Sequence, residues 1–305
     1  MAAPAATRAD AAGVLDRVRA AGVLRCGAAE RPGVAEAEAA TARGVAVDLC
    51  RAVAIAVLGP TGRISFRIYD SERDFDAVRQ GADELVFLSG NDIADHALTG
   101  AILPGPVAVI DGIGIMVPET SPVHNMADLN GRTVCLMIAS GAQRVLERAV
   151  AALHLNIGRI AFQEDSEMLD AYNVQRCQAV VGETTYLADM RRDGGVNRLQ
   201  SRLLPPLVVE PVIAASPIAD GSWSALVYWV IGALMRANSA DDGWEAAAFP
   251  VNARALRLQA DWREMVLAQV GSYAEIVRRN FGALGIGAGP NALWPSGVMV
   301  VPEVR

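Results

Sequence analysis

The sequence is poor in aromatic residues and histidine, and it lacks a hydrophobic run long enough to cross a membrane. Aromatic residues make up 5% of the 305 residues, and there are three histidines. The longest apolar candidate, residues 225–235, is far shorter than the roughly 20 residues of a membrane-spanning helix. The start of the chain, MAAPAATR, lacks the basic start and apolar core of a signal peptide. We therefore expect either a cytoplasmic protein or an exported one whose signal peptide has been removed.

The excess of acidic over basic residues argues against nucleic acid as a partner. There are 27 Lys and Arg against 34 Asp and Glu, a net charge of −7, whereas nucleic-acid-binding domains carry basic patches. With 52% hydrophobic and 20% charged residues, the chain can bury a sizeable core, which excludes global disorder. Its length favours two lobes or one large α/β unit.

Cysteine spacing gives no sign of a metal site. The four cysteines form no Cys-x-x-Cys pair, and the three histidines are scattered, whereas zinc ligands cluster at short spacing. Each cysteine can be a small buried hydrophobic residue, or the four can form two disulfides, which would require an oxidising compartment. Four cysteines allow three connectivities, and spacing alone selects none of them. The cysteines are Cys26, Cys50, Cys135 and Cys177.

The sequence also lacks the motifs of the common enzyme classes. There is no G-x-S-x-G elbow, no Walker loop and no H-E-x-x-H motif. The carboxylates of Glu164, Asp165 and Glu167 are typical of a solvated helix start, because acidic residues favour the first turn of a helix. We therefore expect no catalytic residues, no cofactor and no enzymatic activity.

Apolar periodicity predicts two α/β units followed by helices. In the first unit, strands at 23–27, 64–68 and 85–88 alternate with helices at 45–58 and 71–80, an order typical of a mostly parallel sheet. The pattern then restarts, with strands expected at 111–117, 132–138, 160–162, 179–181 and 207–214, and helices at 140–153, 166–176 and 184–193. Two long helices, 223–238 and 260–280, are expected near the end of the chain.

Several separate segments resemble one family of transport proteins. They are LDRVRAAGVLRCG at 15–27, GVAVDLCRAVA at 44–54, VC at 134–135, RC at 176–177, QVGSYAEI at 269–276 and NALW at 291–294. Each is similar to a segment of the periplasmic solute-binding proteins of ABC importers, general amino-acid-binding type (family 3). The resemblance runs from about residue 13 to the end of the chain.

This resemblance implies an α/β protein with the two-lobed periplasmic-binding-protein fold (type II). Lobe 1 would comprise residues 1–112 and 213–305 and lobe 2 residues 117–208, with hinge strands near 112–117 and 208–214. It also implies disulfides between Cys26 and Cys50 and between Cys135 and Cys177. The expected protein is periplasmic and monomeric, with its signal peptide removed, and it presents a small polar ligand to an ABC-type permease in the membrane.

The ligand-binding positions depart from the family pattern. The family holds the carboxylate of an amino acid with an arginine after the third strand, because a guanidinium offers a bidentate fork. The matching segment here, residues 88–98, contains no arginine. The family's T-G-T-T-T-E loop corresponds to residues 138–143, IASGAQ, which keeps backbone donors at a helix start but loses the threonine hydroxyls. Its ammonium-binding aspartate corresponds to Glu183.

Three hypotheses about the ligand follow. Arg31 replaces the missing arginine and the ligand is a polar amino acid, or the pocket has been retuned to a non-amino-acid metabolite or cofactor. In the third, the pocket is degenerate and the chain is an accessory protein that acts by protein contact. Arg31 and Glu183 are the strongest candidates, because together they would orient a zwitterion from both lobes. The full set of expected ligand-binding residues is Glu30, Arg31, Asn91, Asp92, His96, Ser140, Gly141, Gln143, Glu183 and Thr184.

Overall fold

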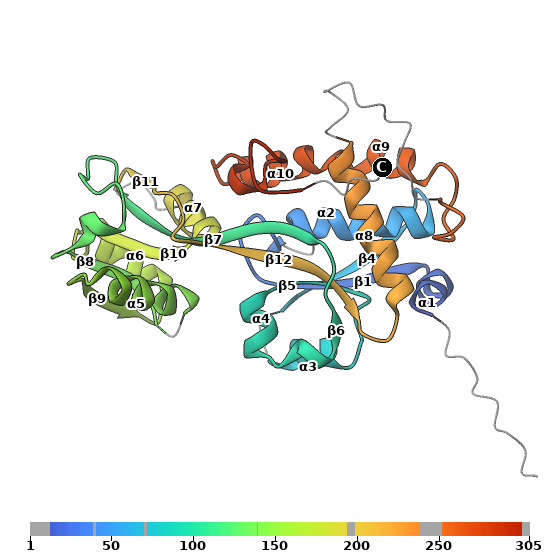
Figure 1. The fold of residues 1–305 in the computed structure, drawn as a ribbon, viewed down its shortest axis with the longest axis horizontal. Coiled ribbons are helices and arrows are strands. Elements are labelled where there is room, and N and C mark those ends of the chain that lie inside the picture. Colours follow the sequence, from blue (N-terminus) through green and yellow to red (C-terminus); the bar gives the residue numbers. More distant parts are fainter. Residues whose placement is uncertain are drawn as a thin grey trace, which may run out of the picture.

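Two lobes joined by a pair of long strands make up the molecule (Figure 1). The computed structural model describes residues 13–38, 41–69, 72–138, 140–193, 199–237 and 252–300. The termini that we assigned to lobe 1, residues 1–12 and 301–305, lie outside the described residues.

The strands and helices are distributed along the chain as follows. The strands are β1 (Val23–Ala29), β2 (Glu36–Glu38), β3 (Thr41–Arg43), β4 (Arg63–Tyr69), β5 (Leu85–Ser89), β6 (Ile102–Leu103), β7 (Val107–Pro118), β8 (Thr133–Met137), β9 (Gly158–Phe162), β10 (Ala179–Glu183), β11 (Ser201–Leu203) and β12 (Val208–Pro217). The helices are α1 (Val14–Ala21), α2 (Val45–Leu58), α3 (Glu72–Arg79), α4 (Gly90–Asp95), α5 (Gly141–Leu153), α6 (Asp165–Asn173), α7 (Thr184–Asp193), α8 (Gly221–Arg236), α9 (Trp262–Val270) and α10 (Tyr273–Ala283). Short 3₁₀ turns include η2 (Met126–Leu129) and η5 (Gly289–Asn291).

Within the described residues, one ten-stranded sheet runs through both lobes. Its main path is β4-β1-β5-β12-β7-β10-β8-β9, with β6 paired to β12 and β11 paired to β7. Strand β1 pairs in parallel with β4 and β5, and β8 pairs in parallel with β9 and β10. The two parallel groups are joined by β7 and β12, which pair antiparallel with each other. These two strands cross from one lobe to the other (Figure 1).

In the lobe that holds the start of the described chain, the core surrounds α2. This helix is apolar on nearly every side, because it packs against β1 and β4 as well as α8 and α9. A second apolar cluster, which includes Tyr69, Phe75 and Leu98, fills the opposite face of the sheet. The disulfide Cys26–Cys50 joins β1 to α2, with 6.4 Å between the two Cα atoms.

The other lobe has two apolar clusters of its own, one on each face of its part of the sheet. One cluster includes Ile115, Leu136 and Leu146, and the other includes Tyr172 and Leu187. The disulfide Cys135–Cys177 joins β8 to the segment before β10, with 5.7 Å between Cα atoms. Both disulfides that the family resemblance implied are therefore present in the structure.

The expected single helix at 260–280 is wrong. The chain forms α9 and α10 instead, separated by Gly271 and Ser272. Gly271 has φ = 86°, a conformation that breaks a helix and suits glycine. The Ser272 hydroxyl accepts a hydrogen bond from the Glu275 N–H, while the Glu275 carboxylate accepts one from the Ser272 N–H. This capping box starts a new helix.

None of the helices within the described ranges has both the length and the apolar character needed to pass through a lipid bilayer.

Candidate functional site

Two acidic residues lie side by side on the strands that join the lobes. Asp111 of β7 and Glu210 of β12 are cross-strand partners in the antiparallel register. Asp111 is 4% exposed and sits in a strand whose other residues are almost all apolar or glycine. A buried carboxylate in such a strand needs polar partners to offset its loss of hydration.

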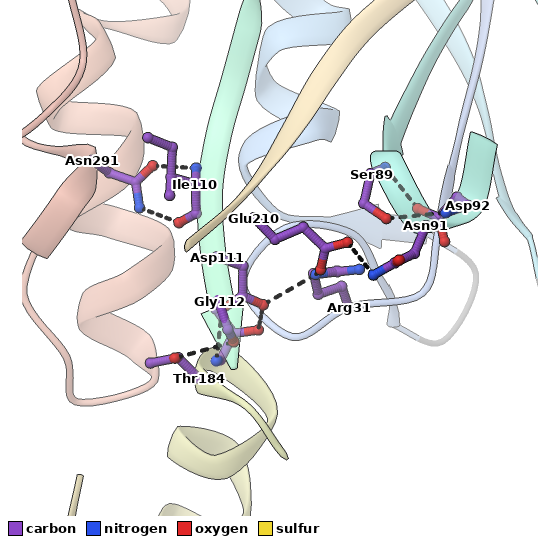
Figure 2. A network of polar contacts seen from close by, with 11 residues as sticks. Arg31, Ser89, Asn91, Asp92, Ile110, Asp111, Gly112, Thr184, Glu210 and Asn291 are labelled. Carbon is purple, nitrogen blue, oxygen red and sulfur yellow. Dashed lines mark hydrogen bonds and ion pairs between the residues drawn. The ribbon is translucent and has the colours of Figure 1, made fainter. Parts of the chain in front are cut away.

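Arg31 provides part of that compensation. It follows β1, and its backbone N–H donates to the Ala35 carbonyl at 2.8 Å, closing a tight turn. Its Nη1 lies 3.3 Å from Asp111 Oδ2 and 3.5 Å from Glu210 Oε2 (Figure 2). Burial lowers the pKa of Arg31, but the nearby carboxylates, Asp111 foremost, outweigh it and hold that pKa above its ordinary value. The guanidinium is therefore fixed in its charged form beside β7 and β12.

Asp111 also binds the start of α7, in the other lobe. Its Oδ2 accepts a hydrogen bond from the Thr185 hydroxyl at 2.7 Å, and its Oδ1 accepts one from the Thr185 N–H at 3.2 Å. The neighbouring Thr184 hydroxyl donates to the Gly112 carbonyl at 3.2 Å. One carboxylate thus links a loop of the first lobe to a helix of the second.

The start of α4 approaches the same acids from the first lobe. Ser89 and Asp92 form a capping box, in which the Asp92 carboxylate accepts from the Ser89 N–H at 2.7 Å. This cap places Asn91 on the first turn, where its Nδ2 donates to Glu210 Oε1 at 2.6 Å (Figure 2).

Glu183 faces this group from the second lobe, at the end of β10. The loss of hydration on burial raises the pKa of Glu183, and the charges of Asp111 and Glu210 add to the increase. A hydrogen bond from its own backbone N–H and the charge of Arg31 act in the opposite direction. A Cβ placed on Gly141 would lie 3.9 Å from Glu183 Oε1 and 3.5 Å from Asn91 Nδ2. The first turn of α5 therefore lies close to both Glu183 and α4. We call Arg31, Asn91, Asp92, Asp111, Glu183 and Glu210 the interlobe cluster.

Two further sets of contacts join the lobes away from this cluster. Arg144 of α5 pairs with Asp95 of α4, with 3.4 Å between Nη2 and Oδ2. On α7, Arg191 donates to the Gly285 carbonyl at 2.8 Å and Arg192 donates to the Ala283 carbonyl at 3.0 Å. The structure is therefore a form in which the lobes touch.

The structure brings together five of the residues that the sequence indicated: Arg31, Asn91, Asp92, Gly141 and Glu183. Glu30 is exposed, and the His96 ring stacks on Phe75 of α3, with 3.5 Å between ring centroids.

The remaining candidates serve local structure. The Ser140 side chain accepts from the Gln143 N–H and so caps α5, and Gln143 Nε2 donates to Glu147 one turn further along that helix. Thr184 contacts the hinge strand. Whether any of these residues touches a ligand stays a prediction.

Asp111, Thr185 and Glu210 were missed. The available signal was a charged residue inside an otherwise apolar strand, in VAVIDGIGIMV at 107–117, because such a residue must find a partner.

Among the described residues, no three His, Cys, Asp or Glu side chains are grouped so that they could hold a metal ion.

Comparisons with known proteins agree with the architecture. No protein-family model matches the chain. It is 27% identical to YhdW of Escherichia coli K12, a protein named as an amino-acid ABC transporter-binding protein, over 98% of this chain and 95% of that one. It is 29% identical to AapJ of Rhizobium johnstonii, a general L-amino acid-binding periplasmic protein, over 95% of this chain and 92% of that one.

The fold matches a solved structure over almost its whole length. An ABC transporter periplasmic binding protein from Brucella ovis, solved with glutathione bound, superposes with a TM-score of 0.77 at 24% identity and covers 97% of this chain and 100% of that one. Two lobes joined by β7 and β12 thus give the chain the two-lobed fold of that periplasmic binding protein. Over nearly its whole length the chain is similar to relatives named as amino-acid-binding proteins of ABC importers, as its sequence segments indicated.

Proposed function

We propose that the chain is a periplasmic receptor that binds a small amino compound between its lobes and presents it to an ABC-type permease. The ligand carries both an ammonium group and a carboxylate, and the protein binds it without chemical change. The relatives support this assignment, since YhdW and AapJ are named as ABC transporter-binding and amino acid-binding proteins and match over nearly the whole chain.

The observation that carries the ligand class is the state of Glu183. Its carboxylate is half-buried, and among the described residues no side chain bonds to it. Its own backbone N–H donates a hydrogen bond to it. A buried carboxylate that has no cation in direct contact is costly, and an ammonium group is the simplest such cation that a solute can bring. In our proposal, the ammonium group of the ligand lies against Glu183.

Arg31 is suited to hold the other end of the ligand. The side-chain contacts of Arg31 all involve Nη1, and among the described residues neither Nε nor Nη2 has a bonding partner. A guanidinium that is held in place through one nitrogen can bind a carboxylate with two hydrogen bonds donated by its other two nitrogens. The first amides of α5, at Gly141 and Ala142, would add donors from the other lobe.

Such a ligand would shift the balance between open and closed forms. Glu183 belongs to the second lobe and Arg31 to the first, so one zwitterion contacts both lobes only when they are together. A ligand that makes contacts only in the closed form stabilises that form by the free energy of those contacts. The permease can then recognise the closed, loaded receptor.

Calorimetric titration and thermal-shift screening of the full chain test this proposal. The panel contains L-amino acids, glutathione, and matched compounds that lack either the amine or the carboxylate. We expect binding by compounds with both groups. Arg31→Ala should weaken a carboxylate-bearing ligand by about 2–5 kcal/mol, the usual loss for a buried charge partner.

The matched control is Arg278→Ala, at an exposed position of α10 whose side chain is 75% exposed. It should leave affinity unchanged. If no compound that carries both an amine and a carboxylate binds at millimolar concentration, the proposed ligand class is wrong. The remaining hypotheses are then a different kind of ligand or a degenerate pocket. Unchanged affinity in Arg31→Ala, with a carboxylate ligand bound, would remove Arg31 from the site.

A further inference from the structure

We propose that the receptor prefers amino compounds that carry more amino groups than carboxylates, and that Glu210 sets this preference. The inference rests on the function proposed above and concerns the net charge of the same ligand. Nothing in the sequence comparison pointed to Glu210, which enters the site only through the pairing of β12 with β7.

The interlobe cluster carries more negative than positive charge. Its four carboxylates belong to Asp92, Asp111, Glu183 and Glu210, and all four act electrostatically on Arg31, the one cation of the cluster. A further ion pair between the lobes, Arg144 with Asp95, is neutral as a pair. The cluster therefore holds an excess of negative charge.

Two of the four carboxylates, Asp111 and Asp92, are already compensated within the protein. Asp111 receives two hydrogen bonds from Thr185 as well as the closer contact of Arg31. Asp92 caps α4 at its N-terminus, where the helix dipole favours a negative charge. Both acids have structural roles that account for their charge.

Glu183 and Glu210 remain. Glu210 accepts from the neutral amide of Asn91 and shares Arg31 Nη1 with Asp111, at the longer distance of 3.5 Å. A single guanidinium cannot neutralise Asp111 and Glu210 together, and Glu183 has no side-chain partner among the described residues. A ligand with one ammonium group balances one of these two acids, and a second cationic group on the ligand would balance the other.

The same geometry disfavours acidic ligands. A solute with a second carboxylate would place that group near Glu183 and Glu210, and like charges brought together at an interface are strongly unfavourable. The expected order of affinity is therefore a basic amino acid first, its neutral counterpart second and its acidic counterpart last.

Ornithine, glutamine and glutamate test this order, because they share an α-amino acid group and have side chains of similar length that differ in charge. Their affinities for the full chain are measured by calorimetry at one ionic strength. We expect the affinity for ornithine to exceed the affinity for glutamine by about tenfold or more, which is the effect of one added charge contact. Glutamate should have the lowest affinity of the three. This ranking uses the wild-type protein and so does not depend on any variant folding.

Glu210→Gln tests the residue itself. Glutamine keeps the size of the side chain and an oxygen for Asn91, while it removes the charge. The advantage of ornithine over glutamine should fall to about threefold or less, and glutamate should gain affinity. Glu264→Gln, at an exposed position of α9, is the control for removal of one negative charge elsewhere and should leave the ranking as it is.

The outcomes separate this inference from the function on which it rests. Equal or tighter binding of glutamine and glutamate would overturn the charge preference and leave an amino-compound receptor. A preference for ornithine that survives unchanged in a folded Glu210→Gln variant would overturn the role of Glu210. If no compound with both groups binds, the proposed function fails and this inference fails with it.

Discussion

Removing the side chain of Asn291 should destabilise β7, one of the two strands that join the lobes. Asn291 lies at the end of η5, is 2% exposed and belongs to the NALW segment that carried the family resemblance. Its Oδ1 accepts from the Ile110 N–H at 2.6 Å and its Nδ2 donates to the Ile110 carbonyl at 2.7 Å (Figure 2). The cross-strand partner of Ile110 is Pro211, which has no N–H to donate. Asn291 therefore supplies the hydrogen-bond partners of the Ile110 backbone groups on β7.

The size of the effect follows from the groups that would be left unpaired. Asn291→Ala strands one buried N–H and one buried carbonyl, and each unsatisfied buried group costs about 1–3 kcal/mol. The weaker contact from the Tyr273 hydroxyl, at 3.4 Å, adds little. We expect the free energy of unfolding to fall by about 2–5 kcal/mol, because a water molecule in the space left behind can recover part of the loss.

Urea unfolding followed by far-UV circular dichroism measures this loss. Asn291→Asp keeps the size and one acceptor but cannot donate to the Ile110 carbonyl, so it should be destabilised as well. Asn156→Ala removes an exposed asparagine and should stay within about 0.5 kcal/mol of wild type. A loss below about 1 kcal/mol for Asn291→Ala would refute the reasoning, since the two stranded backbone groups alone predict more.

Two further predictions concern the disulfides and Glu183. The partners of Cys26–Cys50 and Cys135–Cys177 are 24 and 42 residues apart, for which the chain-entropy model gives stabilisations of about 3.5 and about 4 kcal/mol. Replacing both cysteines of one pair with alanine should therefore lower the free energy of unfolding, measured with urea, by that amount. Four titratable thiols in the unreduced, denatured protein would contradict both bonds. Because burial raises the pKa of Glu183 in the folded state, that state holds the proton more tightly, and stability falls as pH rises through the window above the carboxyl's ordinary value. Glu183→Gln should therefore raise the melting temperature of the ligand-free protein near about pH 7 and lose this gain near about pH 4, and an equal gain at both pH values would exclude the proposed cause.

Much of the fold could be predicted because its signals are local. Helix α2 ends at Gly59 and strand β5 is a short run of apolar residues, and both follow directly from the residues present. The break between α9 and α10 was also written locally, in a glycine followed by Ser272 and Glu275 at capping-box spacing. Helical periodicity continues on both sides of the break, and for this reason the sequence pattern predicted a single helix over 260–280.

Part of the candidate site could be predicted from the family resemblance and from where the sequence departs from it. Glu183 was found because it follows a cysteine-containing segment that matches the family, and Arg31 because the expected arginine was missing from residues 88–98. Asp111 and Glu210 could not be paired from the sequence, because the two residues are far apart in the chain. Only the register of β7 against β12 makes them neighbours.

The position of these acids explains how ligand charge and lobe movement can be coupled. Asp111 lies on a strand that passes between the lobes, and it bonds to Arg31 of one lobe and Thr185 of the other. Any rotation of the lobes about β7 and β12 must therefore stretch one of these contacts or carry the carboxylate with it. Glu210, on the neighbouring strand, is held by Arg31 and Asn91, both in the first lobe. A cationic group of the ligand that binds beside Glu210 would thus stabilise the contacts that hold β12 to the first lobe. Glu183 would bring the second lobe to the same positive charge, so that binding favours the form in which the lobes are together.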